Sequence, residues 1–270
     1  KNVLQVGKIS RAWRVVDVGD FNLDGVDDIY WFNKNNRHIA LWYINYVPGS
    51  SDQWIGAASG CLKGEVNGKN WSPVAVGDVS VASDGPEILW SNKDTGEVMF
   101  RMRSATNPDI VRSSVDVVTP GGTAIAAGEG WSARQLGDFD ANGIAGDILM
   151  QNFDTGEVEI WLMNYQVALN RLACVFNGSA AITDWTPVGI GLCTGSDTVE
   201  YSNMYWREKG YPWSVMGWQM DRTTLFGATP PSAEDVYDSN AYLQDGILAS
   251  PSSINRVVDF QLSGLVSDIP

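Results

Sequence analysis

The sequence predicts an all-β fold made of repeated sheets, and two observations predict it. The 270-residue chain contains 28 Gly and 12 Trp but only 19% charged residues, a composition typical of many short strands joined by tight turns. One sequence pattern also returns four times along the chain, which indicates that each copy forms one supersecondary unit. A chain of this length is able to form a single all-β domain, so we expect one domain over residues 1–270.

The repeat is marked by a leading tryptophan in each copy. These tryptophans are 58, 60 and 54 residues apart, somewhat more than the ~40–50 residues of a four-stranded propeller repeat. Each copy has a first strand that runs from the tryptophan to Gly-Asp or a remnant of it, then an apolar strand, a turn and a further apolar strand; the first strand begins Trp-x-x-Val in all copies but the third. The leading residues are Trp13, Trp71, Trp131 and Trp185, and the copies cover about 13–70, 71–130, 131–184 and 185–230.

The residues of the repeat resemble a known family. Gly19-Asp20-Phe21-Asn22 and the Asp-Thr-Gly-Glu turns at 94–97 and 154–157 are similar to the FG-GAP, or VCBS-like, repeats over about residues 13–220. The resemblance implies a β-propeller of four recognisable four-stranded blades, as in the integrin α-subunit head and many bacterial surface proteins. A composite fifth blade would be closed by an N-terminal strand at residues 3–9 together with C-terminal strands, with residues 231–270 forming a closing strand or an extension.

The loop from Asp20 to Asp28 carries the pattern of a calcium site. Oxygen-bearing side chains stand at positions 1, 3, 5 and 9, with Gly25 at position 6 for the sharp turn and a backbone carbonyl expected at position 7. Trp31 takes the place of the EF-hand glutamate, so a loop between two strands is expected instead. A solvated acidic turn is the alternative. The expected ligands are Asp20, Asn22, Asp24, Val26 through its carbonyl, and Asp28.

The third copy has a variant of the same loop, in which the last carboxylate comes one residue later. Calcium sites tolerate flexible geometry, so this loop is a second candidate. The second copy lacks a carboxylate at the fifth position and the fourth copy is further eroded, so we expect no metal there. The ligands expected in the third copy are Asp138, Asp140, Asn142 and Asp147.

The charge balance limits the partners. The chain has 18 Lys and Arg against 32 Asp and Glu, a net charge of −14, which repels phosphate backbones and excludes nucleic acid as an expected partner. No apolar run approaches the roughly 20 residues of a membrane-spanning helix. Calcium dependence and the family resemblance favour a secreted, extracellular or cell-surface location. The three cysteines are read in two ways, as a Cys174–Cys193 disulfide with Cys61 free or as three small buried hydrophobic residues.

Catalytic motifs are absent from the sequence, so we expect no catalytic residues and no organic cofactor. The single histidine, His38, lies in a turn of the first copy. Aromatic residues gather in the fourth copy, where they would either stack on a sugar or partner or pack as a terminal cap. The candidate ligand-binding residues are Trp206, Tyr211, Trp213 and Trp218.

The expected function is that of a non-enzymatic, Ca²⁺-stabilised extracellular module for protein contact, of the adhesion or filament type, with a protein partner or self-assembly. A lectin-like propeller that binds carbohydrate is the first alternative. A hydrolase or lyase that acts on polysaccharide is the second alternative.

Overall fold

The computed structural model describes residues 9–45, 54–58, 68, 70–80, 85–104, 107–140, 142–175, 185–192, 202–208, 215–218 and 236–238. The regular structure in this part of the chain is all β, which confirms the predicted fold class. None of these residues forms a helix long and apolar enough to cross a bilayer. The predicted N-terminal strand at residues 3–9, apart from Ile9, and most of the segment 231–270 lie outside the described residues.

The strands form four sheets that follow the order of the chain, mostly as antiparallel meanders. The first sheet contains β1 (Trp13–Gly19), β2 (Asp28–Asn33), β3 (Ile39–Asn45) and β4 (Trp54–Ala58). The second contains β5 (Trp71–Gly77), β6 (Glu87–Asn92), β7 (Val98–Ser104) and β8 (Asn107–Asp116). The third contains β9 (Trp131–Gly137), β10 (Asp147–Asn152), β11 (Val158–Asn164) and β12 (Val167–Val175). The fourth contains β13 (Trp185–Leu192), β14 (Ser202–Glu208) and β15 (Val215–Trp218).

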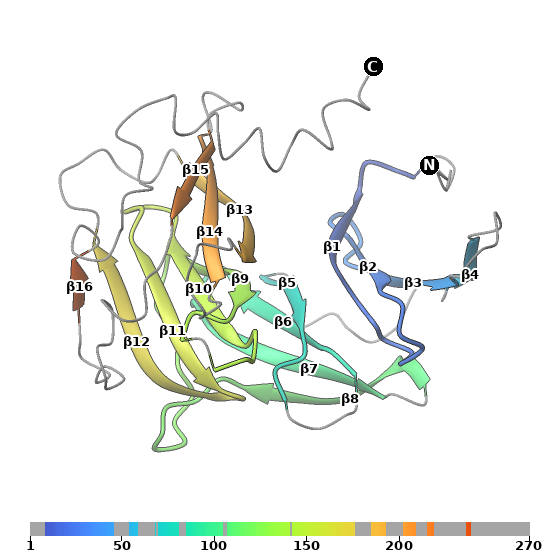
Figure 1. Ribbon diagram of the computed structural model, residues 1–270, viewed down its shortest axis with the longest axis horizontal. Helices are drawn as coiled ribbons and strands as arrows, with labels where there is room; N and C mark the ends of the chain where they lie inside the picture. The colour runs from blue at the N-terminus through green and yellow to red at the C-terminus, as the bar shows by residue number, and fades with distance from the viewer. Residues whose placement is uncertain are drawn as a thin grey trace. The chain divides into compact units, whose positions relative to one another are not determined.

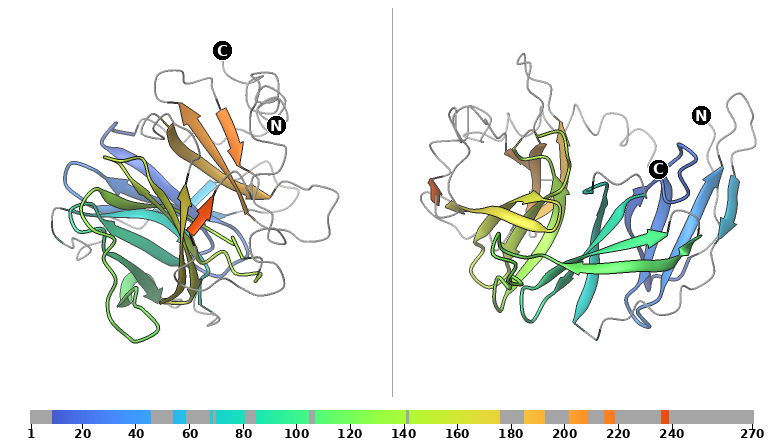
Figure 2. Two further views of the ribbon diagram at one scale, coloured as in Figure 1. Left: turned by 90° about the vertical axis from the view of Figure 1, so that its left-hand side faces the viewer. Right: turned by 90° about the horizontal axis from the view of Figure 1, so that it is seen from below.

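A short C-terminal strand joins the third sheet. In β16 (Val236–Asp238), Val236 pairs with Ala173 in parallel to β12, so this sheet has five strands in the order β16-β12-β11-β10-β9 (Figure 1). The first sheet keeps the simple order β1-β2-β3-β4, and its strands lie side by side in blue in Figure 2. The described residues of the fourth copy form three strands rather than the four that were expected.

Three sheets share the same irregularity in their first strand. The register shifts between Val15 and Asp17 in β1, between Pro73 and Ala75 in β5, and between Pro187 and Gly189 in β13. Each shift falls between the third and fifth residues from the leading tryptophan, so one residue is left over as a β-bulge. Proline is tolerated at this position because the strand lies at a sheet edge, where a missing N–H is harmless. The sequence repeat is therefore also a repeat in strand pairing.

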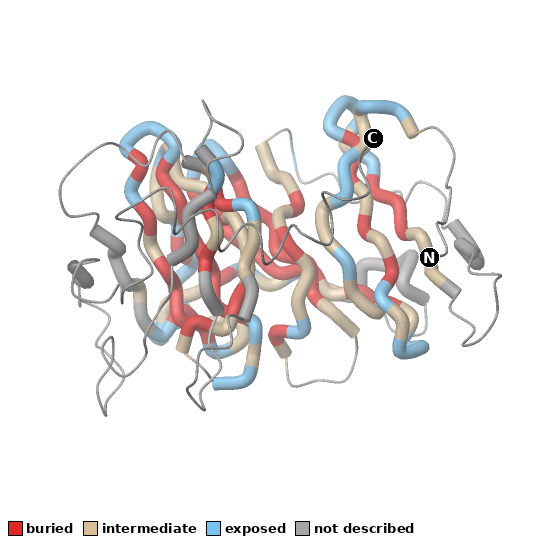
Figure 3. Tube along the Cα trace, turned by 45° about the horizontal axis from the view of Figure 1, so that its top comes forward, coloured by how far each residue is buried: buried red, intermediate tan, exposed pale blue. Residues whose placement is uncertain are grey.

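The second strands of the second and third copies, β6 and β10, are the most deeply buried elements of their sheets. All six residues of β6 and all six of β10 are buried, and Figure 3 shows buried residues concentrated along the inner strands. Burial on both faces explains why Glu87-Ile-Leu-Trp-Ser-Asn92 and Asp147-Ile-Leu-Met-Gln-Asn152 lack the alternation of a one-sided strand. Ile88 and Ile148 lie opposite Arg101 and Trp161 in equivalent registers.

The chain divides into two compact units, Lys1–Ala133 with Tyr165–Val167 and Arg134–Asn164 with Ala168–Pro270. The first unit has a core that the first two sheets share: Phe32 of β2 meets Trp90 of β6 edge to face at 6.3 Å between ring centroids. Asp17 of β1 also accepts the Val76 N–H of β5 at 3.0 Å. In the second unit, a Cβ on Gly137 of β9 would lie 3.2 Å from Ile190 of β13, so these strands approach closely.

The segment 117–130 is held on the turn between β6 and β7. The N–H groups of Ala127 and Gly128 donate to the carbonyls of Gly96 and Thr95 at 3.2 and 3.0 Å. Gly96 has φ of 69°, as expected for the Asp-Thr-Gly-Glu turn, and a Cβ there would lie 2.6 Å from the Gly128 carbonyl oxygen. Glycine is required at this position for both reasons, because its backbone conformation and its close neighbour each exclude a side chain.

We predict that Gly96→Ala destabilises the protein much more than Gly122→Ala does. Both glycines have positive φ, but a Cβ on Gly122 meets nothing within 4 Å. Gly122→Ala should therefore lower the free energy of unfolding only by the cost of placing alanine in the left-handed conformation, about 1–2 kcal/mol. Gly96→Ala should add about 1–3 kcal/mol of overpacking, because Gly128 must move. Urea unfolding of both variants measures the difference, and equal losses of stability would contradict the packing of segment 117–130 on this turn.

Candidate metal centre

A buried carboxylate fixes the start of the second strand in three of the four copies. Asp28, Glu87 and Asp147 are the first residues of β2, β6 and β10, and each is at most 1% exposed. Each accepts the N–H of the residue that follows Gly-Asp in its own copy: Phe21 to Asp28 at 3.1 Å, Val79 to Glu87 at 3.0 Å and Phe139 to Asp147 at 2.7 Å. We call Asp28, Glu87 and Asp147 the anchor carboxylates.

Two anchor carboxylates also reach the third strand of their sheet. Asp28 accepts the Ile44 N–H at 3.0 Å, and Asp147 accepts the Met163 N–H at 2.8 Å. Asp147 accepts a further bond from the Asp140 N–H at 3.2 Å. Each of these two side chains therefore connects the Gly-Asp loop with both neighbouring strands, so the loop is held in place by the sheet.

The loop from Asp20 to Asp28 is shaped by its own side-chain oxygens. Asp20 accepts the N–H groups of Asp24 and Gly25 at 3.0 and 2.8 Å, and Asp24 accepts the Val26 N–H at 2.9 Å. Asn22 accepts the Asp24 N–H at 3.1 Å and donates its amide to Asp24 Oδ2 at 3.0 Å. These bonds wrap the backbone around the side-chain oxygens, with Gly25 at φ of 85° making the turn.

The loop from Asp138 to Asp147 repeats the four bonds that backbone N–H groups donate to side-chain oxygens in the first loop. Asp138 accepts the N–H groups of Asn142 and Gly143 at 3.0 and 2.9 Å, as Asp20 does in the first loop. Asp140 accepts the Asn142 N–H at 3.1 Å, and Asn142 accepts the Ile144 N–H at 2.8 Å. Gly143 has φ of 87° at the position of Gly25. The two loops are therefore built in the same way.

The extra residue of the second loop is absorbed in a tight turn. The Gly146 N–H donates to the Ile144 carbonyl at 2.7 Å, which shortens the path to β10. Asp147 consequently takes the same place as Asp28 although it comes one residue later in the sequence.

Three carboxylates of the second loop come together. Asp138, Asp140 and Asp147 each offer an oxygen atom, and these atoms lie within 4.8 Å of one another. Two oxygens bound to the same Ca²⁺ at 2.3–2.6 Å lie at most about 5 Å apart, so this spacing is compatible with one shared ion. Among the described residues this is the group of three acidic side chains with such spacing; Asp20, Asp24 and Asp28 are not gathered as tightly.

The hydrogen bonds leave room for a metal. A carboxylate has about four lone-pair sites. Asp147 uses three of them for backbone N–H groups, so it retains an acceptor site. The donor set is made entirely of oxygens from carboxylates and an amide, which is the chemistry that Ca²⁺ prefers. The residues therefore fit a hard divalent cation.

Burial disfavours the ionised forms of Asp147 and Asp140 in the second loop. Burial and, to a smaller extent, the nearby Asp140 carboxylate raise the pKa of Asp147 to about 8, against the lowering effect of the backbone N–H groups. Burial also raises the pKa of Asp140, with a contribution from Asp138. In the first loop, burial raises the pKa of Asp28 to about 6, with smaller contributions from Asp24 and Asp20. A divalent cation would offset both causes.

The structure describes two of the four aromatic candidates for ligand binding in the fourth copy. Trp206 of β14 is 0% exposed, so its indole belongs to the interior and offers no open ring to a ligand. Trp218 is the last residue of β15, and its backbone pairs with Met204. Tyr211 and Trp213 lie outside the described residues, as do Cys61 and Cys193 and therefore the Cys174–Cys193 pairing.

We predict that Glu87→Gln makes stability less sensitive to pH. Burial raises the pKa of Glu87, so the folded state holds this proton more tightly than the unfolded chain. The contribution of Glu87 to stability is therefore present below a pH of about 4.5 and is lost as pH rises through the folded pKa. Glutamine keeps the acceptor oxygen for the Val79 N–H without the charge. Urea unfolding between pH 4 and pH 7, without divalent cations, should show the variant gaining stability relative to the wild type as pH rises. A constant difference would contradict the prediction.

Comparisons with known proteins leave the family open. No protein-family model and no curated protein matches the chain. One structural similarity is to a chain of Chaetomium thermophilum Polycomb Repressive Complex 2 bound to GSK126, with 10% identity and a TM-score of 0.39. The aligned region covers 86% of this chain and 43% of that chain, so it spans less than half of that chain's length. A similarity at this level carries no argument about fold or function.

Proposed function

We propose that the chain is a β-propeller whose four sheets are its blades. The spacing of the leading tryptophans, the shared bulge of β1, β5 and β13, and the repeated anchor carboxylates support this arrangement. In the first unit the first two sheets share a core, as neighbouring blades do. The antiparallel meander within each copy, with strands paired in chain order, is the strand order of a propeller blade.

We propose further that Ca²⁺ stabilises this fold. The observation that carries the proposal is the group of Asp138, Asp140 and Asp147, whose oxygens lie within 4.8 Å of one another around an Asx-shaped loop. A cation that binds the folded state alone adds its binding free energy to stability. Weak sites with dissociation constants of about 0.1–1 mM are typical of extracellular modules, where Ca²⁺ is plentiful.

The proposed role is a non-enzymatic, extracellular module for protein contact. The single histidine, His38, is exposed in a turn. The anchor carboxylates Asp28, Glu87 and Asp147 are each engaged by backbone N–H groups inside the sheets, so their chemistry serves the fold. The buried position of Trp206 favours a packing role over sugar stacking for the aromatic residues of β14. The net charge of −14 suits a basic protein partner.

We predict that calcium binds the wild type and that Asp140→Asn weakens binding at the second loop roughly tenfold or more. Asparagine keeps an oxygen for the Asn142 N–H, so the loop keeps its shape and loses one charge. Isothermal titration with CaCl₂ after removal of divalent cations measures the affinity. At a Ca²⁺ concentration 100 times the dissociation constant, the wild type should gain about 2.7 kcal/mol of stability.

Asp154→Asn is the matched control, because Asp154 is an exposed carboxylate in the turn between β10 and β11 of the same sheet. This variant should bind Ca²⁺ like the wild type. A wild type that neither binds millimolar Ca²⁺ nor gains stability from it would overturn the proposal, and so would an unchanged affinity in Asp140→Asn.

A further inference from the structure

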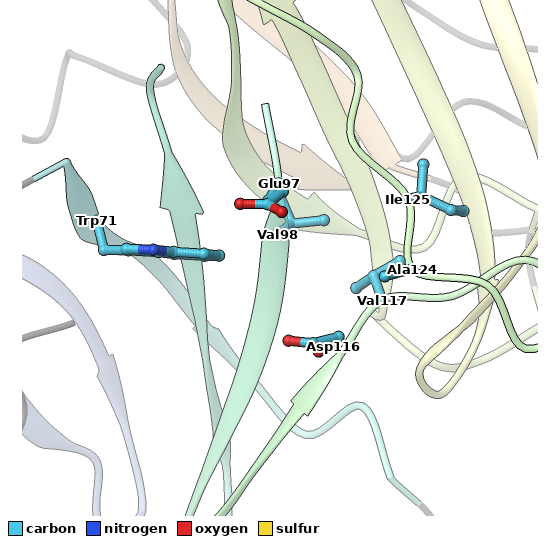
Figure 4. A pocket seen from close by; sticks show the side chains of 7 residues that line it. All are labelled: Trp71, Glu97, Val98, Asp116, Val117, Ala124 and Ile125. Atoms are coloured by element: carbon cyan, nitrogen blue, oxygen red, sulfur yellow. The ribbon is translucent and has the colours of Figure 1, made fainter. Parts of the chain in front are cut away.

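The first unit contains a small pocket beneath the segment 117–130. The pocket has a volume of ≈ 70 Å³ and lies beside the turn that Gly96 makes with Gly128. In Figure 4 the Trp71 indole extends from one side toward the carboxylates of Glu97 and Asp116. Val117 and Ile125 lie on the other side, which gives the pocket an apolar wall opposite the indole.

Both carboxylates of the pocket lack a cationic partner among the described residues, whose ion pairs involve other side chains. Glu97 accepts the Thr95 hydroxyl at 2.7 Å and the Asn92 amide at 3.3 Å through the same oxygen, Oε2. No donor among the described residues contacts its second oxygen, Oε1. Asp116 is exposed at the end of β8. Two negative charges, an aromatic wall and an apolar wall therefore meet in one small space.

This combination selects an organic cation. An ammonium or guanidinium group forms charge-assisted hydrogen bonds with carboxylates and is attracted to an indole ring. The aliphatic stem of lysine or arginine packs well on apolar side chains such as Val117 and Ile125. The volume also limits the size of the ligand. Pockets for drug-sized molecules measure about 300–1,000 Å³, which is far more than this pocket offers. A pocket of ≈ 70 Å³ fits the end of one side chain and not a sugar chain.

The pocket depends on a segment that follows the last strand of the second sheet. Glu157 occupies the position of Glu97 in the third copy and accepts the Thr155 hydroxyl at the same distance of 2.7 Å. The loop that covers the pocket, however, comes from the segment 117–130, which begins directly after β8. The feature is therefore not a by-product of the repeated turn.

We propose that this pocket binds the cationic end of a lysine or arginine side chain of a partner protein. Trp71 forms the aromatic wall, Glu97 and Asp116 bind the charge, and the apolar side chains of segment 117–130 contact the aliphatic stem. The inference names the chemistry of the partner and so rests on the proposed function as a protein-contact module. The overall negative charge increases the rate of encounter with such a basic partner.

The test uses the full chain in saturating Ca²⁺ and two-dimensional ¹H–¹⁵N NMR. N-acetyl-arginine amide and N-acetyl-lysine amide are titrated, with neutral N-acetyl-norleucine amide as the reference ligand. The expected result is a dissociation constant on the order of 1 mM for the cations. The shifts should centre on the Trp71 indole and on the amides of Gly96 and Ile125, and the neutral ligand should not produce them.

Two variants and one matched control decide the assignment. Glu97→Gln and Asp116→Asn should each weaken binding roughly two- to fivefold, the range for exposed charge pairs. Glu157→Gln makes the same change in the equivalent turn of the third copy and should leave binding unchanged. Equal shifts with the neutral ligand, no shifts at the pocket, or equal affinity in all three variants would overturn the proposal.

Calcium titration of the same samples separates this proposal from the proposed function. Glu97→Gln should bind Ca²⁺ like the wild type, because Glu97 is remote in sequence from both loops and is not one of the proposed ligands. A failure of cation binding with normal Ca²⁺ binding overturns the pocket alone, whereas the loss of both would overturn the stabilised module as well.

Discussion

The structure depends on buried carboxylates at the start of the second strand of its sheets. A carboxylate that is at most 1% exposed is costly unless its oxygens are hydrogen-bonded, and the anchors Asp28, Glu87 and Asp147 accept backbone N–H groups from the Gly-Asp segments. The bonds hold Phe21, Val79 and Phe139 at the start of the loop, where these three side chains are buried as well. In each of these three copies, one polar contact thus fixes the loop, the strand register and a core position.

The same contact explains how a bound metal would become part of the fold. With Asp147 raised to a pKa of about 8, three backbone N–H groups do not fully compensate the cost of its charge. A cation beside Asp138 and Asp140 would supply the missing compensation and would join the loop to β10 and β11. In the second copy a hydrogen bond from Ser80 to Glu87 favours the ionised form, although burial still leaves the pKa of Glu87 raised. Equivalent positions would therefore differ in how much stability a bound metal adds.

Much of the fold could be predicted from the sequence because the repeated motifs mark where strands begin and where hairpins turn. The leading tryptophans mark the first strands, and the Asp-Thr-Gly-Glu turns mark the hairpins, with Gly96 and Gly156 at positive φ as expected. The sequence could not predict that the carboxylates gather more tightly in the second loop than in the first. This difference depends on the Ile144–Gly146 turn, which places Asp147 in register with Asp28. Glu87 was missed because its longer side chain reaches the Val79 N–H from an otherwise eroded loop. The pocket at Trp71 was missed because segment 117–130 follows the repeated motifs of the second copy and carries none of them.

The central claim is that one carboxylate, Asp147, both anchors the sheet and binds Ca²⁺. A high-resolution crystal structure of the chain grown in millimolar CaCl₂ tests this most directly. The account predicts an ion bound by oxygens of Asp138, Asp140, Asn142 and Asp147 at about 2.3–2.6 Å, with the bonds from Phe139 and Met163 to Asp147 retained. Well-defined density for this loop without an ion, or an ion that displaces those backbone bonds, would contradict it.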